Sequence, residues 1–333
     1  MLTHKVAGRT YNYDYCIGRE GTSGNSFLQP QGFAVGSGGS LYVVSKGNEF
    51  VPAYGITKCN LNHEINWEER GLSFAGGESP WPASVALNSN ENVYVSDDYS
   101  SVISMHDKDG NFLGTWGTKG SGDGELDGPS GLAFDKDDNL YVVDSLNHRV
   151  QKFTKDGKFL AKWGSQGSGL GQFSFPWGIS IDKDGNVYVA DWKNDRVQKL
   201  TPDGKYLASF GSSGTGDGQL RAPTGVAIDS AGDVYVTDWG NDRLNIYAAD
   251  GTFITSFIGD AERLSPWCEE SVQASPDYIK ARKRVDLTEE WRFKRPAAVN
   301  VDNEGRIMVL ETVRARIQVY VKEPTWVDAQ FNL

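Results

Sequence analysis

The side chains most suited to acid–base chemistry are those of Lys46, Asp98 and Tyr99. Lys46 follows an apolar run that ends at Ser45, and Asp98 and Tyr99 follow an equivalent run that ends at Asp97. An amine, a carboxylate and a phenol gathered in one place can exchange protons with a bound molecule. The alternative is a surface ion pair that contributes nothing to binding or catalysis.

Tryptophans occupy related places later in the chain. Trp192 and Trp239 each follow an Asp that ends an apolar run, in "YVADWKNDR" and "YVTDWGNDR", and Trp177 follows a proline. A small polar residue is expected in such turns. The indoles can stack on a flat apolar or sugar-like ligand or anchor a partner protein, and the alternative is that they pack against neighbouring strands.

An internal repeat determines where these side chains lie. Each unit has four short alternating runs separated by turn sequences such as DKDD, SLNH and KDG, a pattern typical of a propeller blade. Six prolines open such units: Pro30, Pro82, Pro129, Pro176, Pro223 and Pro296. The three middle intervals are 47 residues long, and insertions at about 47–56 and 260–292 lengthen the first and the last. We therefore expect residues 1–333 to form one all-β domain, a six-bladed β-propeller with four antiparallel strands per blade.

The sixth unit takes its outer strand from the N-terminus. No fourth run follows "ARIQVYV", whereas "YDYCIGREGTSGNSFLQP" near the start matches "LGTWGTKGSGDGELDGP" ahead of blade three. We therefore expect the N-terminal strand to complete the last blade, which leaves no open sheet edge between the ends of the ring.

The units resemble NHL repeats. Blade three carries "PSGLAFD", "LYVVD" and "NHRV", and blades four and five carry close copies. The resemblance is strong from 80 to 260 and loose elsewhere, and it also implies a six-bladed propeller. Propellers of this kind bind proteins, bind RNA or catalyse reactions, so the function depends on the residues at the site.

Two rings of side chains are expected at one mouth of the central channel, because the first strand of a blade is innermost and begins where the second strand ends. The residues after the opening prolines are Gln31, Ala83, Ser130, Trp177, Thr224 and Ala297. The residues after the second strands are Lys46, Asp98, Ser145, Trp192, Trp239 and Thr312. Their types differ among blades while the flanking residues repeat, so we expect both rings to face a cavity.

The peptidyl-hydroxyglycine amidating lyases, which resemble this chain in blade pattern, place metal-binding histidines after the blade-opening proline. Here the matching residues are Ala83, Trp177 and Ala297, so the resemblance implies that this zinc site is missing. Lys46 lies at the position of their catalytic arginine. A lysine there retains the positive charge but cannot form the bidentate hydrogen bonds of a guanidinium group.

No metal or other cofactor is predicted. The four histidines lie off both rings, and the "DKDG" and "DKDDN" runs lack the downstream Glu of a calcium loop, so we interpret them as hairpin turns. The recurring Asp, Asn and Arg sets of blades three to five, such as Asp144, Asn147 and Arg149, are interpreted as scaffold.

The second insertion contains "SPDYIKARKRVDL", in which Ser275, Pro276 and Asp277 predict the start of a short helix. Its basic residues suit a docking surface, a lid that attracts anionic ligands, or a solvated helix face. They are Lys280, Arg282, Lys283, Arg284, Arg292, Lys294 and Arg295.

Arg295 and Arg221 lie just ahead of blade-opening prolines, so we expect both near the mouth. With Lys46 they would form a cationic pocket suited to a carboxylate or a phosphate. Phe50 and Tyr54 of the first insertion are expected to cover Lys46, and both insertions are expected to flank the cavity.

Composition limits the possible partners. The 333 residues carry a formal charge of -11, which argues against a broad RNA-binding face or an anionic membrane surface. The three cysteines, Cys16, Cys59 and Cys268, fit no metal spacing and are expected to be reduced and mostly buried. No stretch has the length of a membrane span, and the first residues lack the apolar segment of a signal peptide. We expect a cytoplasmic protein.

The favoured hypothesis is a propeller that binds a small organic anion, an aromatic ligand or a partner peptide at the channel mouth. Its binding residues would be Trp177, Trp192, Trp239, Arg221, Arg295 and Gln31. The competing hypothesis is a lyase or hydrolase in which Lys46, Asp98 and Tyr99 carry out the chemistry and Arg295 holds an anionic group.

Overall fold

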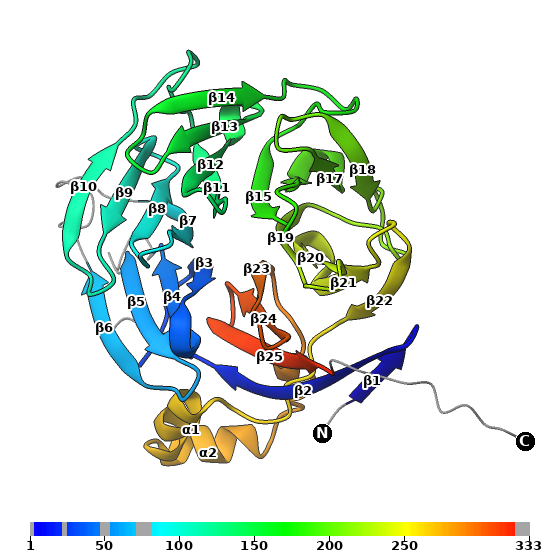
Figure 1. Ribbon diagram of the computed structural model, residues 1–333. Coiled ribbons are helices and arrows are strands. Elements are labelled where there is room, and N and C mark those ends of the chain that lie inside the picture. Colours follow the sequence, from blue (N-terminus) through cyan, green and yellow to red (C-terminus); the bar gives the residue numbers. More distant parts are fainter. Residues whose placement is uncertain (1–2, 22–24, 47–53, 71–80, 324–333) are drawn as a thin grey trace, which may run out of the picture.

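The chain forms a ring of six antiparallel sheets around a central channel (Figure 1). The computed structural model describes residues 3–21, 25–46, 54–70 and 81–323. Every inner strand begins at one of the six predicted prolines. The predicted six-bladed propeller is confirmed.

Blades one to three follow the chain from the innermost to the outermost strand. Blade one has β3 (Pro30–Val35), β4 (Ser40–Ser45), β5 (Gly55–Asn60) and β6 (Ile65–Arg70). Blade two has β7 (Pro82–Leu87), β8 (Val93–Asp97), β9 (Val102–His106) and β10 (Phe112–Trp116). Blade three has β11 (Pro129–Phe134), β12 (Asn139–Asp144), β13 (Arg149–Thr154) and β14 (Phe159–Trp163).

Blades four and five repeat this order, and blade six uses both ends of the chain. Blade four has β15 (Pro176–Ile181), β16 (Val187–Asp191), β17 (Arg196–Leu200) and β18 (Tyr206–Phe210). Blade five has β19 (Pro223–Ile228), β20 (Val234–Asp238), β21 (Arg243–Tyr247) and β22 (Phe253–Phe257). Blade six has β23 (Pro296–Val301), β24 (Arg306–Glu311), β25 (Arg316–Lys322), β2 (Arg9–Ile17) and β1 (Thr3–Val6).

The core lies between neighbouring blades. Tyr188 and Ala190 of blade four, for example, pack with Val226 and Val236 of blade five. The second strand of each of these blades is buried along its whole length, which accounts for its nearly continuous apolar sequence. Inner strands also approach closely at glycines, since a Cβ atom on Gly178 would collide with the carbonyl oxygen of Thr224.

The N-terminal strand closes the ring as predicted, because β2 pairs with β25 along its length. The sequence did not predict β1, which adds a fifth strand outside β2. A buried ionic cluster fixes this closure to blade five. Arg9 contacts Asp233 through two hydrogen bonds of 2.5 and 2.6 Å, and Lys322 of β25 lies 2.7 Å from the same carboxylate.

The insertion between blades five and six forms α1 (Pro266–Gln273), α2 (Pro276–Arg282) and α3 (Thr288–Trp291). Helix α2 is the predicted helix, although Ser275 makes no side-chain capping hydrogen bond. Helix α1 was not predicted; Ser265 caps it by accepting a hydrogen bond from the Cys268 amide.

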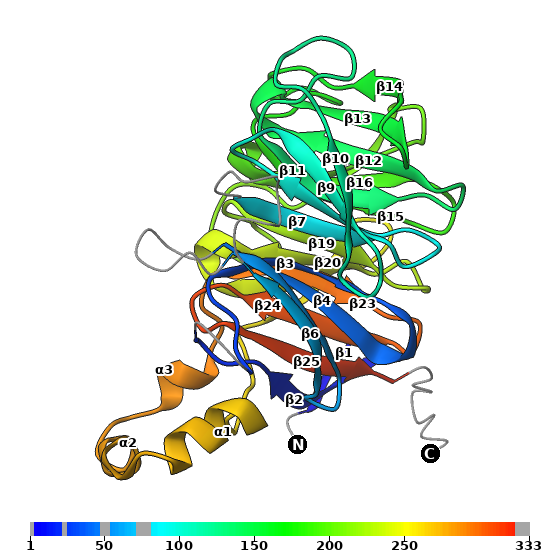
Figure 2. The same cartoon turned by 90° about the vertical axis from the view of Figure 1, so that its left-hand side faces the viewer.

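The helices do not cover the channel, which corrects the expectation that this insertion flanks the cavity. Figure 1 shows α1 and α2 outside the ring beyond β2, and Figure 2 shows all three helices at one corner of the molecule. The reason is Trp267, which is 3% exposed, packs on Phe27 and donates a hydrogen bond of 2.7 Å to the His63 carbonyl. This contact holds α1 against the outer part of blades six and one.

The cysteines are as predicted from the sequence. Cys16 and Cys59 are buried, Cys268 is half-buried, and all three are free thiols. Within the described ranges, no helix has the length and apolar character needed to cross a membrane.

Candidate functional site

Both predicted rings lie at the same end of the channel. The strand register pairs Pro129 with Asp144 and Pro176 with Asp191, and the other blades follow the same rule. The start of each first strand therefore lies beside the end of the second strand. We call this end the mouth.

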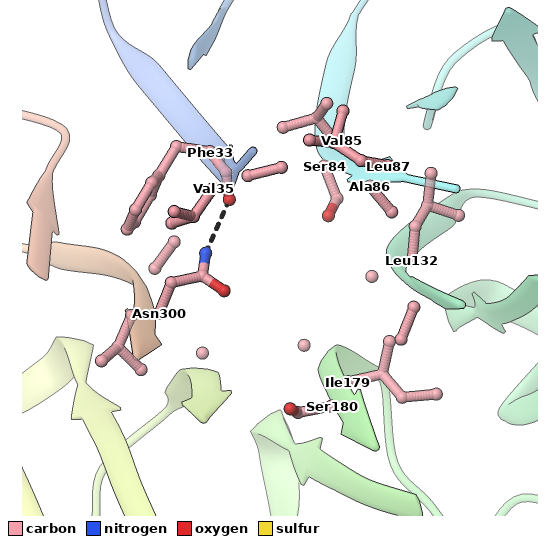
Figure 3. A pocket seen from close by; sticks show the side chains of 18 of the residues that line it. Phe33, Val35, Ser84, Val85, Ala86, Leu87, Leu132, Ile179, Ser180 and Asn300 are labelled. Atoms are coloured by element: carbon pink, nitrogen blue, oxygen red, sulfur yellow. Dashed lines mark hydrogen bonds between the residues drawn. The ribbon is translucent and has the colours of Figure 1, made fainter. Parts of the chain in front are cut away.

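The central cavity has a volume of about 630 Å³ and is lined by the inner strands (Figure 3). Gln31, Ala83, Trp177, Thr224 and Ala297 of the first ring belong to its lining, and the second ring lies outside it. Deeper in the channel, Asn300 donates a hydrogen bond of 2.7 Å to the Phe33 carbonyl. Figure 3 shows its amide oxygen and the hydroxyl of Ser84 directed into the cavity.

The expectation that both rings face the cavity is wrong for the second ring, and in blade three it is wrong for both rings. Ser130 is fully buried and Ser145 is 4% exposed, and their hydroxyl oxygens lie 2.6 Å apart. Ser145 also donates a hydrogen bond of 2.5 Å to the Pro176 carbonyl of the next blade. These two side chains connect blades and do not face the cavity, so variation in residue type was not a sufficient sign of exposure.

On one side of the mouth, Lys46 and Asp98 lie together as the sequence suggested. The Lys46 ammonium is 3.9 Å from Asp98 Oδ2 and 3.9 Å from the ring centroid of Trp81. Trp81 and Tyr99 are 44% and 66% exposed, with ring centroids 6.0 Å apart. An amine, a carboxylate and two accessible aromatic faces therefore meet between blades one and two.

Burial moves both ionisable groups toward neutrality. Desolvation lowers the pKa of Lys46, and the charges of Asp98 and Asp97 only partly oppose this shift. Desolvation also raises the pKa of Asp98, against the opposing effect of Lys46. Asp98 Oδ1 is buried and accepts no hydrogen bond from the described part of the chain. The pair can therefore exchange a proton more readily than an exposed ion pair.

The expected covering of Lys46 by Phe50 and Tyr54 is not seen in the described residues. Phe50, like the rest of 47–53, lies outside the described residues. Tyr54 is buried just ahead of β5, and the ring that lies over Lys46 is that of Trp81.

On another side of the mouth, Arg295 lies over Trp239. The guanidinium carbon is 4.8 Å from the ring centroid, the arginine is exposed and the indole is half-buried. The Arg295 backbone amide is held by Asp242 at 2.7 Å, and the neighbouring Lys294 ammonium neutralises the same carboxylate. No described carboxylate lies within ion-pair distance of the Arg295 side chain.

Arg221 joins this group through its backbone. Its amide donates a hydrogen bond of 2.7 Å to Asp238, and its carbonyl accepts one of 2.8 Å from Gly240. These contacts hold Arg221 against the residues on either side of Trp239. Its exposed side chain also has no carboxylate partner among the described residues. The backbone of Arg221 thus borders Trp239, and the guanidinium of Arg295 lies over the indole.

The remaining predicted ligand residues are more dispersed. Trp177 and Trp192 are half-buried, and no ring contact joins either of them to Trp239 within the described ranges. Trp192 lies beside Lys193, whose ammonium is 4.0 Å from the ring centroid of Phe175. Gln31 is half-buried and donates a hydrogen bond of 2.9 Å to the Gln29 carbonyl.

The recurring carboxylates act as scaffold. Asp144 accepts hydrogen bonds from the Asp127 amide, Asn147, Arg149 and Gln151, and it is fully buried. Asp191 and Asp238 make the same kinds of contact in blades four and five. In the parts of the chain that the structure describes, no group of three or more His, Cys, Asp or Glu side chains is placed to hold a metal ion.

Comparison with known protein families agrees with this architecture. The NHL repeat model matches residues 220–247, which comprise most of blade five, and the SMP-30/gluconolactonase/LRE-like region model matches residues 121–215. The chain is a six-bladed β-propeller whose fifth blade matches the NHL repeat. No curated protein matches the sequence.

Solved structures share the fold of this propeller at low sequence identity. A structural genomics protein of unknown function from Bacteroides thetaiotaomicron is 18% identical with a TM-score of 0.66, and the match covers 95% of this chain and 76% of that one. A streptogramin B lyase is 12% identical with a TM-score of 0.60, over 94% and 98% of the two chains. Virginiamycin B lyase from Staphylococcus aureus is 14% identical with a TM-score of 0.58, over 93% and 99%.

Sequence reasoning missed Trp81, although the signal was present. Trp81 immediately precedes Pro82, as Arg295 precedes Pro296 and Phe175 precedes Pro176. The position that placed Arg295 near the mouth therefore also placed Trp81 there. Two residues at this position, Trp81 and Arg295, contact Lys46 and Trp239 of the second ring.

Proposed function

We propose that this propeller binds a small organic anion at its mouth, between Trp239, Arg221 and Arg295. The observation that carries the proposal is the exposed guanidinium of Arg295 over the half-buried indole of Trp239, without a described carboxylate partner. The exposed Arg221 is attached through its backbone to the residues on either side of that indole and also lacks such a partner. A guanidinium group binds carboxylate or phosphate with directed, charge-assisted hydrogen bonds. The indole supplies an apolar face for the body of the ligand.

The contrast between these two arginines and the others in the chain supports this proposal. A chain with a formal charge of -11 repels anions at long range, so an anion site requires local cations that are not already neutralised. Many other arginines are engaged, for example Arg149, Arg196 and Arg243 with the scaffold carboxylates. Arg221 and Arg295 differ from them because they are exposed and have no carboxylate partner among the described residues.

Isothermal titration calorimetry with benzoate, indole-3-acetate and citrate tests the proposal. Binding of at least one probe is expected, with an affinity at least about 100 times lower in the Arg221→Gln/Arg295→Gln variant, because it loses two or more charge-assisted hydrogen bonds of about 1.5–3 kcal/mol each. Lys280→Gln/Lys283→Gln removes the same charge from the outer insertion and serves as the control. Equal binding to both double variants, or no binding of any probe, would reject the anion site.

A second candidate function is a lyase or hydrolase reaction that uses Lys46 and Asp98. It is favoured by their separation of 3.9 Å and by burial, which moves the pKa values of both groups toward neutrality. Tyr99 would add a phenol beside the pair, and Arg295 would hold an anionic group of the substrate. A Lys46 that titrates like an exposed lysine would remove the support for this candidate.

A further inference from the structure

We propose that Lys46 forms an imine with an aromatic or conjugated aldehyde that stacks at the mouth, and that Asp98 carries the proton for this reaction. This inference concerns the side of the mouth between blades one and two, and it does not require the anion site beside Trp239. It assigns a covalent chemistry to a pair of residues otherwise considered only for general acid–base work.

The surroundings of Lys46 favour a nucleophilic amine. Its side chain is 24% exposed, and its nitrogen lies over the face of Trp81 and 3.9 Å from Asp98, which is longer than a hydrogen bond. Within the described ranges the amine therefore has no hydrogen-bond acceptor that fixes its protons. Desolvation lowers its pKa, so the neutral amine that attacks a carbonyl carbon is more accessible than for an exposed lysine.

Asp98 is suited to hold the proton that Lys46 releases. Its Oδ1 atom is buried without a described hydrogen-bond donor, and burial raises its pKa. The preceding Asp97 performs the scaffold task instead, since it accepts hydrogen bonds from the amides of Trp81, Tyr99 and Ser100 at 2.9–3.0 Å. Asp98 is thus an additional carboxylate that the turn does not need.

Comparison with the other blades shows that the scaffold does not require an amine or a carboxylate at these positions. At the equivalent position of blade six, the Thr312 hydroxyl donates a hydrogen bond of 2.9 Å to the Pro30 carbonyl of the next blade. Ser145 makes the corresponding contact from blade three to blade four. The side chains of Lys46 and Asp98 make no such inter-blade hydrogen bond to a described carbonyl, so packing alone does not account for their charges.

The reaction balances without an oxidant or a reductant. A proton passes from the Lys46 ammonium to Asp98 through one water, since 3.9 Å is too long for a direct transfer, and the free amine adds to the carbonyl carbon to give a carbinolamine. The protonated Asp98 returns a proton to the departing hydroxyl, which leaves as water while the C=N bond forms. Hydrolysis runs through the same steps in reverse, so the bond is reversible.

The two exposed rings define the class of carbonyl compound. Trp81 and Tyr99 are 44% and 66% exposed, and their planes are inclined by only 35°. Flat rings in this arrangement offer stacking area to a planar ligand. An aldehyde attached to an aromatic ring can stack there while its carbonyl carbon reaches the amine, whereas a saturated aldehyde gains less from the same surface.

Reductive trapping tests the inference on the full chain. The protein is incubated with benzaldehyde or 4-carboxybenzaldehyde in the presence of cyanoborohydride, and the modified lysines are identified by peptide mass spectrometry. Lys193 is the matched control, because its amine also lies over an aromatic ring, at 4.0 Å from Phe175, but without a described carboxylate beside it. We expect trapping at Lys46 at least tenfold faster than at Lys193.

Two variants make the result specific. Asp98→Asn is expected to slow trapping at Lys46 about tenfold or more while Lys193 reacts as before, because the loss of the proton carrier outweighs the further lowering of the Lys46 pKa. Lys46→Arg is expected to abolish the modified peptide without changing the Lys193 signal. Trapping at Lys46 that is no faster than at Lys193, or that is unaffected by Asp98→Asn, would overturn the inference.

The two probes separate this inference from the proposed anion site. If Lys46 is trapped equally well by both aldehydes, the imine chemistry stands and anion binding makes no contribution to it. If the Arg221→Gln/Arg295→Gln variant loses only a preference for 4-carboxybenzaldehyde, both proposals are supported. If benzoate binds but neither aldehyde is trapped selectively at Lys46, the anion site stands and the imine is rejected.

Discussion

The guanidinium of Arg295 lies 4.8 Å from the ring centroid of Trp239, and this contact connects blade six to blade five at the mouth of the channel. It places a cation on an indole face while leaving the hydrogen-bond donors of the guanidinium accessible. The indole thus restricts the position of Arg295 without neutralising its charge. An anion that binds there meets a cation whose orientation is already partly fixed.

Replacing Trp239 should therefore weaken anion binding even though no charge is lost. A cation–π contact contributes about 0.5–2 kcal/mol, so Trp239→Ala is expected to raise the Kd for benzoate about 2–30-fold. Titration calorimetry measures this change. Tyr278→Ala, which removes a 62% exposed ring from the outer insertion, should leave the Kd unchanged. Equal affinities for wild type and Trp239→Ala would show that the indole does not position Arg295.

Lys46 should titrate below the ordinary lysine value of 10.5, because burial beside Trp81 disfavours its ammonium form. Asp98 opposes that shift, so Asp98→Asn should lower the pKa of Lys46 further. NMR titration of ¹³C-methylated lysines follows Lys46 directly, and Lys46→Arg identifies its signal. A pKa at or above 10.5, or an increase in Asp98→Asn, would contradict the electrostatic description of this pair.

The closure of the ring should depend on Asp233. This carboxylate is 1% exposed and contacts both Arg9 and Lys322, so Asp233→Ala leaves two cations without their common partner. Removing one member of a buried ionic cluster costs about 3–5 kcal/mol in the free energy of unfolding, measurable by urea denaturation. Asp137→Asn breaks the exposed pair with Lys136 and should have no measurable effect. A similar small effect of both substitutions would show that the cluster does not stabilise the closure.

The same cluster predicts a loss of stability in acid. Burial alone would raise the pKa of Asp233, but the hydrogen bonds and charges of Arg9 and Lys322 outweigh it and hold the pKa below the ordinary value of 3.8. The folded state therefore gains stability from this group above pH 3.8 and loses it as the pH falls toward the lowered folded-state pKa. In thermal unfolding of wild type and Asp233→Asn between pH 7 and pH 3, the stability difference should begin to shrink below about pH 3.8. Parallel curves would exclude this linkage.

Trp267 should control whether the helical insertion stays attached to the ring. Trp267→Ala removes a buried indole and its hydrogen bond to His63, a change that typically costs about 3–5 kcal/mol. Hydrogen exchange should accelerate in α1 and α2 while the blade strands stay protected, because few other buried side chains hold these helices. Tyr278→Ala is the control. Unchanged protection of α1 would show that other contacts hold the insertion in place.

The sequence predicted the fold well because the blade is a local pattern. The spacing of the opening prolines and the alternation within each unit predicted all six inner strands. The match between the N-terminal segment and the segment ahead of Pro129 predicted the N-terminal closure. Helix α1 had a usable signal in Ser265 and Pro266, the same pair of residue types that predicted α2.

The site was only partly predictable, because its features depend on contacts between distant segments. The pairing of Lys46 with Asp98 followed from equivalent positions on adjacent blades, and the structure brings the two groups to 3.9 Å. The position of the helical insertion could not be inferred, since it depends on how Trp267 packs against Phe27. The burial of Ser145 likewise depends on its hydrogen bond to the carbonyl of Pro176 in the next blade.

The most direct test of the central claim is a crystal structure of the protein with 4-iodobenzoate, in which the anomalous signal of iodine locates the probe. We expect the probe at the mouth, with its carboxylate on Arg221 and Arg295 and its ring on Trp239, and no signal there in Arg221→Gln/Arg295→Gln crystals. Iodine found only at other sites, or an unchanged signal in the double variant, would contradict the proposal that this propeller binds organic anions at its mouth.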